Sequence, residues 1–156
     1  MDLRFDITKE EPDAFKAIMG LEGYVQKSGV DRRYLDLAKI RASQINGCAY
    51  CVDMHSKEAR KAGFSDQWIE LIAVWQESGL YDERERAVLN WTESVTRVSE
   101  THIPDRDFDQ LRAHFSLSDI AKITVAISTI NVWNRMALAL RLQHPIDGPI
   151  RRQAAE

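Results

Sequence analysis

The chain has 156 residues, of which 44% are hydrophobic and 29% charged, and its formal net charge is −3 at pH 7. A chain of this size and composition is typical of one globular domain, and its charge excludes a general attraction to nucleic acid or to an anionic membrane. The N-terminus lacks the apolar core of a signal peptide, and no unbroken run of about 18 apolar residues is present to span a bilayer. We therefore expect a single domain over residues 1–156, a cytoplasmic location, and neither nucleic acid nor membrane as a partner.

Helix signals recur along the sequence, whereas Val, Ile and Thr show no sustained alternation with a period of two. Proline, the strongest helix breaker, is absent between Asp13 and Ile103. The sequence therefore predicts an all-α fold, a single-domain bundle of about seven helices. In chain order the predicted helices cover about 12–27, 31–44 and 48–63, then begin near 65, 82 and 104, and end with one over about 118–142.

The predicted helix over residues 118–142 carries apolar residues around most of its circumference. A helix that is apolar on nearly every side must be covered on nearly every side. The other short helices of the chain are expected to cover one face, which leaves the other for a second subunit. This pattern favours a homo-oligomer, although a central core helix of a monomer would produce the same pattern.

Cys48 and Cys51, the only cysteines, are one helical turn apart, and His55 follows on the next turn. Because each helical residue advances by about 100°, the three side chains share one stripe. Asn46-Gly47 is suited to ending one helix just before them. The cysteines are then expected in the first turn of the next helix, where free N–H groups and the helix dipole favour a thiolate.

Three interpretations fit this C-x-x-C sequence. A lone pair of this kind in a reducing compartment is more typical of a redox or metal site than of a structural disulfide. As a peroxidase, one thiolate would attack a hydroperoxide, become a sulfenic acid, and be resolved by the other cysteine. A zinc site would need a fourth ligand beyond Cys48, Cys51 and His55, and two inert buried cysteines are the third interpretation. We favour the dithiol and expect neither a metal nor a cofactor.

His55 is suited to taking a proton from a thiol and returning it to a leaving group. It lies nearer to Cys51, which nominates Cys51 as the attacking residue. The precedent of other C-x-x-C helices, in which the cysteine nearer the helix terminus attacks, favours Cys48 instead. The spacing alone leaves both assignments open.

A histidine that serves as a base usually needs a carboxylate to orient it or to relay its proton. Asp36 is the first candidate, because it lies on the predicted helix over 31–44 among apolar neighbours. An ordinary ion pair with Lys39 or Arg32 across a helical turn explains Asp36 equally well. Glu93, on the predicted helix after residue 82, is the second candidate.

The sequence from Arg41 to His55, with Ala59 to Gly63 after it, resembles the core of the carboxymuconolactone decarboxylase superfamily, in its alkylhydroperoxidase D-like branch. Residues 85–93 and 130–135 resemble the same branch, so the resemblance covers about residues 30–140. It implies all-helical subunits that form trimers or hexamers. It also implies reduction of organic hydroperoxides by a C-x-x-C pair with a proton relay of carboxylate, water and histidine.

By motif position, the resemblance makes Cys51 the peroxide-attacking residue, Cys48 the resolving residue and His55 the relay histidine. The relay glutamate of the family falls twelve residues before the first cysteine, at Asp36 in this chain. Two departures stand out: aspartate is one methylene shorter than glutamate, and Tyr50 occupies a position where the best-known peroxidases carry histidine.

The sequence therefore predicts a thiol-dependent peroxidase that consumes an organic hydroperoxide and a dithiol reductant of the lipoyl or thioredoxin type. A redox-sensing or adaptor protein with a reversible disulfide is the non-enzymatic alternative. The second alternative is a lactone decarboxylase of the same superfamily. The decarboxylase branch does not need the two cysteines that this chain retains.

Overall fold

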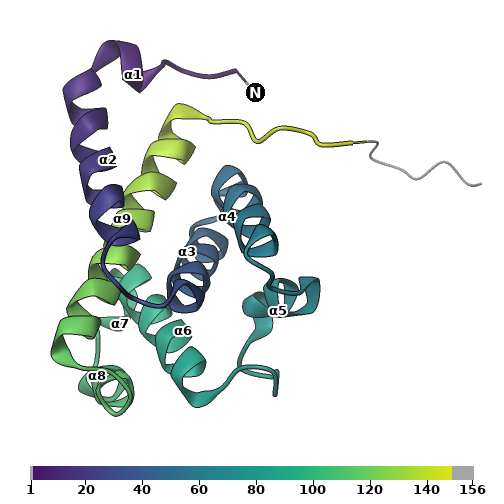
Figure 1. Ribbon diagram of the computed structural model, residues 1–156. Helices are drawn as coiled ribbons and strands as arrows, with labels where there is room; N and C mark the ends of the chain where they lie inside the picture. The colour runs from purple at the N-terminus through teal and green to yellow at the C-terminus, as the bar shows by residue number, and fades with distance from the viewer. Residues whose placement is uncertain (1, 149–156) are drawn as a thin grey trace, which may run out of the picture.

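The computed structural model describes residues 2–148, and these residues form nine α-helices and one 3₁₀ helix without any strand. The predicted all-α class is confirmed. The elements in chain order are α1 (Ile7–Glu10), α2 (Pro12–Gln26), α3 (Arg32–Asn46), α4 (Ala49–Lys61), α5 (Asp66–Glu70), η1 (Leu71–Val74), α6 (Glu83–Thr96), α7 (Val98–Thr101), α8 (Asp105–Arg112) and α9 (Leu117–Leu140) (Figure 1).

The helix starts follow the capping residues of the sequence. Pro12 opens α2, the Ser65 side chain caps α5, and Asp82 forms a reciprocal capping box with Glu85 at the start of α6. The sequence did not predict α1 or α7, each four residues long and without a buried residue. Such single turns bury no apolar face, so they leave no periodic pattern to detect.

Helix α3 lies at the centre of the molecule, between α4, α6 and α9 (Figure 1). Nine of its residues are buried, and Leu37 and Ile40 are fully enclosed together with Ile72, Leu89 and Ile127. Burying an aliphatic side chain of this kind contributes about 1.5–3 kcal/mol. This core fixes α3, and α3 in turn fixes the position at which α4 begins.

Helix α9 is buried in part by its own chain. Five helices pack against it, namely α2, α3, α4, α6 and α8. Ten of its 24 residues are buried in this way, and the second subunit that we expected on its other face stays a prediction. Leu117 and Leu138, near its two ends, remain 62% and 47% exposed.

Helix α2 also leaves apolar side chains uncovered by the rest of the chain. This 15-residue helix buries only Val25, against α9, while Met19 and Tyr24 remain 46% and 50% exposed. Figure 1 shows α2 at the edge of the molecule, beside α9. The case for a second subunit therefore rests on α2 as well as on α9.

Helix α9 is long and apolar enough to cross a membrane, judged by its length and its mean hydropathy of 1.2 alone. The sequence argument considered only unbroken apolar runs and did not select it. Of the residues in that window, 44% are buried inside the molecule. A central core helix meets the same requirement, and the packing of five helices around α9 makes it such a helix here.

Candidate functional site

The junction between α3 and α4 places the two cysteines. Gly47 ends α3 in the left-handed region, with φ of 69°, which glycine adopts at little cost. Cys48 then takes an extended conformation as the N-cap of α4, and its Sγ accepts a hydrogen bond from the Cys51 N–H at 3.3 Å. The predicted helix start at the cysteines is confirmed, with Cys51 in the first turn.

Cys48 and Cys51 form a disulfide, with their Cα atoms 5.3 Å apart, inside the usual range for such a bond. Their exposed fractions are only 1% and 2%. Around them pack buried and partly buried side chains of α3, α4 and α9: Ala42, Tyr50, Ile130, Trp133 and Ala137. The predicted proximity of the two sulfurs is confirmed, and the environment of the pair is apolar.

A cavity of about 250 Å³ lies beside the disulfide, between the start of α4, the end of α9 and the segment that follows α9. Its lining residues are Gly47, Cys48, Ala49, Tyr50, Ala137, Leu138, Arg141, Leu142, Gln143 and His144. Cys48 is part of this lining and Cys51 is not. The cavity therefore lies on the Cys48 side of the disulfide.

His55, one turn beyond Cys51, is buried, with 4% exposed. Its Nδ1 lies 2.9 Å from Oε2 of Glu58, whereas Nε2 has no hydrogen-bond partner within residues 2–148. This hydrogen bond lowers the pKa of Glu58, so the carboxylate stays ionised and acts only as an acceptor. In neutral His55 the proton then sits on Nδ1, and Nε2 is left as a buried, unpaired acceptor.

Asp36 is also buried, with 4% exposed, and its Oδ2 accepts a hydrogen bond from Nε of Arg32 at 3.1 Å. Asp36 thus forms the ordinary ion pair that the sequence allowed, while Lys39 pairs with Glu22 at 2.6 Å. Burial raises the pKa of Asp36, against the opposing effects of Arg32, Lys39 and His55. Asp36 lies close enough for His55 to influence its charge, but the described residues show no direct hydrogen bond between them.

Glu93 lies in a different network. Its Oε1 accepts hydrogen bonds from Nε of Arg41 at 2.8 Å and from Nε1 of Trp75 at 2.7 Å. No hydrogen bond joins Glu93 to His55 in the described part of the chain. The carboxylate that does bond His55 is Glu58, which sequence reasoning missed, although the i, i+3 spacing on one helix was a readable signal.

The zinc interpretation needed a fourth ligand near Cys48, Cys51 and His55. Within residues 2–148, no group of three or more His, Cys, Asp or Glu side chains is arranged to hold a metal ion. The structure describes Cys48 and Cys51 as a disulfide, with His55 one turn beyond Cys51 on α4.

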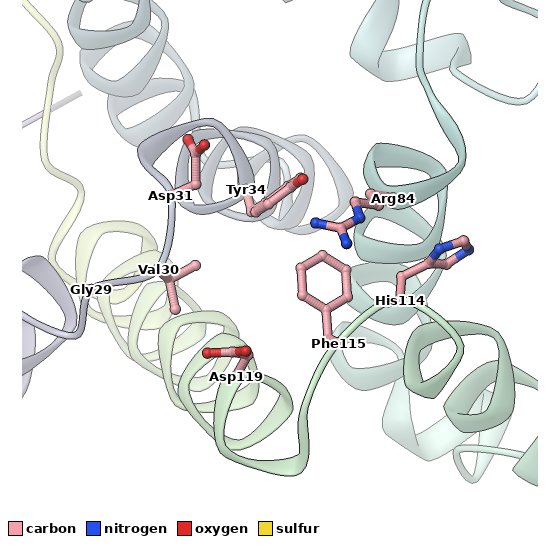
Figure 2. Close-up of a pocket in the computed structure, with 8 residues that line it drawn as sticks. All are labelled: Gly29, Val30, Asp31, Tyr34, Arg84, His114, Phe115 and Asp119. Carbon is pink, nitrogen blue, oxygen red and sulfur yellow. The ribbon is translucent and has the colours of Figure 1, made fainter.

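A second cavity, of about 270 Å³, lies away from all four predicted site residues. Figure 2 shows its lining, with Asp31 and Asp119 on one side and Arg84 and His114 on the other. The Arg84 guanidinium lies 5.8 Å from the centre of the Phe115 ring. This cavity is charged and polar, and it contains no group of known redox chemistry.

Comparisons with known proteins identify the family and agree with this fold. The model of the carboxymuconolactone decarboxylase family matches residues 12–94. The uncharacterised protein YdfG of Bacillus subtilis is 34% identical over 140 residues, which cover 90% of this chain and 95% of YdfG. Alkyl hydroperoxide reductase AhpD of Coxiella burnetii is 37% identical over 46 residues, which cover 30% of this chain and 26% of that enzyme.

Among solved structures, the similarity is high to ATU0492 of Agrobacterium tumefaciens, a protein of unknown function for which a role in antioxidant defence, as an AhpD protein, has been suggested. The TM-score is 0.92 and the identity 55%, over 94% of this chain and all of that one. The debrominase Bmp8 shares the fold, with a TM-score of 0.79, at 23% identity over 87% of this chain and 73% of that one.

Proposed function

The chain belongs to the carboxymuconolactone decarboxylase family, in its AhpD-like branch, and on this basis we propose that it is a thiol-dependent peroxidase that reduces organic hydroperoxides. The observation that carries the proposal is the buried Cys48–Cys51 pair, one turn from a histidine whose Nε2 is unpaired. A dithiol that closes to a disulfide, with a base beside it, supplies two electrons and the means to move a proton.

The first half of the proposed cycle is the reaction of Cys51 with the peroxide. His55 Nε2 takes the Cys51 proton, and the first turn of α4 helps to stabilise the thiolate. The thiolate attacks the terminal oxygen of the hydroperoxide, so that an S–O bond forms and the O–O bond breaks. The departing alkoxide takes the proton back from Nε2, which leaves an alcohol and a Cys51 sulfenic acid.

The second half restores the thiols. The Cys48 thiol attacks the Cys51 sulfenic sulfur, and the hydroxyl leaves with the Cys48 proton as water. A thiolate of the external dithiol then attacks Cys48, the cysteine of the pair that belongs to the cavity lining, and Cys51 leaves as the thiolate. The second thiol of the donor releases Cys48, so the donor is oxidised to a disulfide and both cysteines are reduced.

We assign Asp36 a supporting role, as a carboxyl that exchanges protons with His55 through water. Its burial and raised pKa support this role, because a carboxyl that titrates closer to neutral pH exchanges protons more readily. Its shorter side chain, and the hydrogen bond that it accepts from Arg32, are consistent with a water between Asp36 and His55 rather than a direct contact.

The donor we propose is a dithiol of the lipoyl or thioredoxin type, in the cytoplasm, where such reductants are maintained. We also propose that the chain forms a homo-oligomer through α2, where Met19 and Tyr24 lie exposed on a helix with a single buried residue. Light scattering tests this directly: a monomer of 17.9 kDa at micromolar concentration would contradict it.

The test of the activity is consumption of cumene hydroperoxide with dihydrolipoamide as the donor, and separately with a thioredoxin system. Wild type should turn over many times, and Cys51→Ser should not consume peroxide. Cys48→Ser should react once and stop at a sulfenic acid that dimedone traps on Cys51. A sulfenic acid on Cys48 in the Cys51→Ser variant would reverse the assignment. One equivalent of peroxide consumed by wild type, and no more, would indicate a redox sensor.

A further inference from the structure

The acid–base chemistry proposed for His55 depends on which ring nitrogen carries the proton. A neutral imidazole has one donor and one acceptor, and only the acceptor is able to take a thiol proton. In this chain the Nδ1 atom lies 2.9 Å from the Glu58 carboxylate, and Nε2 is buried without a partner among the described residues. The histidine therefore depends on a neighbour to hold it in the tautomer that leaves Nε2 free.

Asp36, the carboxylate expected from the sequence, does not provide that contact. Its Oδ2 accepts from Arg32 at 3.1 Å, and the Asp36 side chain is only 6% exposed. The Glu58 side chain bonds His55 and is 48% exposed. Arg32 connects Asp36 to the backbone of Glu58, because its Nη2 also donates a hydrogen bond to the Glu58 backbone carbonyl at 3.0 Å.

We propose that Glu58 is the positioning residue of His55: its carboxylate fixes the Nδ1–H tautomer and stabilises the imidazolium that forms when Nε2 takes the Cys51 proton. This inference rests on the proposed function for its catalytic consequence, although the tautomer itself does not depend on any activity. A carboxylate that only accepts is suited to this task, since it cannot donate to Nδ1 and so cannot stabilise the other tautomer.

The charged groups near Glu58 are consistent with this role. Arg32, Asp36 and Lys39 come from α3, the helix that packs most closely on this side of α4, and Lys39 is already paired with Glu22. Besides the hydrogen bond from His55, the two cations also favour the ionised form of Glu58 and lower its pKa. Glu58 therefore stays an acceptor over the neutral range, where the thiol must be activated.

The informative substitution is Glu58→Gln, because glutamine keeps the shape but has an amide that is able to donate to Nδ1 as well as accept from it. We expect ¹⁵N NMR of the histidine rings to report a protonated Nδ1 in wild type and a mixture of tautomers in Glu58→Gln. Glu58→Asp keeps the carboxylate and should restore part of the wild-type spectrum. Glu70→Gln, at an exposed carboxylate on α5, is the matched control for loss of one negative charge.

The second readout is the pH dependence of Cys51 alkylation, measured in reduced protein that also carries Cys48→Ser. Serine is a favoured N-cap residue, so this background preserves the start of α4. Glu58→Gln should raise the apparent pKa of Cys51 by roughly one unit, which corresponds to a tenfold weaker bias toward the ion pair. In protein that retains Cys48, peroxide turnover of Glu58→Gln should fall by a similar factor, while Glu70→Gln should match wild type in both measurements.

The outcomes separate this inference from the proposed function. Unchanged tautomer and alkylation profiles in Glu58→Gln would overturn the inference, even if wild type reduces peroxide many times. Shifted profiles in a protein without peroxidase turnover would support Glu58 as the positioning residue and contradict the proposed function. Circular dichroism and the thermal midpoint of each variant distinguish loss of the helix from loss of the hydrogen bond.

Discussion

The cavity beside Cys48 and the cavity lined by Arg84 and His114 have similar volumes, about 250 and 270 Å³, but their surroundings differ. The first lies against a buried disulfide, with His55 one turn away. It is bordered by the start of α4, which follows α3 directly, and by the end of α9. The second is lined largely by charged and polar groups, several of which already have partners on the surface, such as Asp119 with Ser116.

The comparison teaches that volume alone does not locate chemistry in this molecule. What distinguishes the first cavity is the Cys48–Cys51 disulfide beside it, one turn from a buried His55 nitrogen that has no partner within residues 2–148.

The largest effect is expected at the sulfurs. Cys51→Ser should lower peroxide turnover by at least about 10⁴-fold, as is typical for loss of a nucleophile. His114→Ala and Arg84→Ala, in the other cavity, should leave turnover within a factor of two or so, because about 0.4 kcal/mol is a usual surface effect. Steady-state peroxide consumption measures all three, and a large loss in His114→Ala would reverse the comparison between the cavities.

Loss of the base should have the next largest effect. His55→Ala removes the group that takes the Cys51 proton, and general-base catalysis contributes about 10²–10⁴-fold. We expect turnover to fall by that factor, and alkylation of Cys51 to require a pH closer to about 8.5, the ordinary pKa of a thiol. Rapid alkylation at neutral pH in His55→Ala would show that the helix start alone activates the thiol.

A smaller effect is expected at Asp36, whose proposed link to His55 runs through water. Asp36→Asn should lower turnover by roughly tenfold, below the range for the base itself, and change the first alkylation less. Asp36→Glu restores the longer carboxylate implied by the family resemblance, and it should keep or increase activity. Full activity in Asp36→Asn would leave bulk water as the proton source for the cycle.

The smallest effect concerns stability. Because burial raises the pKa of Asp36 above its ordinary value of 3.8, the folded protein binds this proton more tightly than the unfolded chain does. Binding of this proton adds to the free energy of unfolding at pH values below the pKa that Asp36 has in the unfolded chain. That contribution is lost as the pH rises through the pKa that Asp36 has in the folded protein. Asp36→Asn should therefore gain unfolding free energy relative to wild type between about pH 3 and about pH 7.

At Glu58 we expect the free energy of unfolding to change with pH in the opposite direction. Its pKa is lowered below 4.5, so its contribution to stability is present above the unfolded pKa and is lost as pH falls through the folded value. Glu58→Gln should lose unfolding free energy relative to wild type over the same rise in pH. Urea denaturation at several pH values measures both variants, and equal signs would contradict the assigned charge environments.

Much of the site was predictable because its residues are close in sequence. The Asn46-Gly47 stop and the spacing of Cys48 and Cys51 depend on local helix geometry, so the junction of α3 and α4 followed from the sequence. The longer helices were predictable for the same reason, since most have a capping residue or a proline at the start and a periodic apolar pattern. The sequence could not show how far a single chain would cover α9, which depends on tertiary packing.

The carboxylates show where sequence reasoning was less successful. Asp36 was selected by its apolar neighbours and by family position, but its hydrogen bond goes to Arg32. Glu58 was not considered as a partner of His55, and the contact between the two side chains runs across one turn of α4. Glu93 has its own partners in Arg41 and Trp75, which only the packing of α3, η1 and α6 reveals.

The central claim is that Cys48 and Cys51 cycle between dithiol and disulfide at the expense of a hydroperoxide. The most direct measurement is the amount of alcohol formed from cumene hydroperoxide per subunit, in excess dihydrolipoamide, with wild type and Cys51→Ser compared. The account predicts many equivalents of alcohol from wild type and none above background from Cys51→Ser. One equivalent or fewer from wild type, with either dihydrolipoamide or a thioredoxin system as the donor, would contradict it.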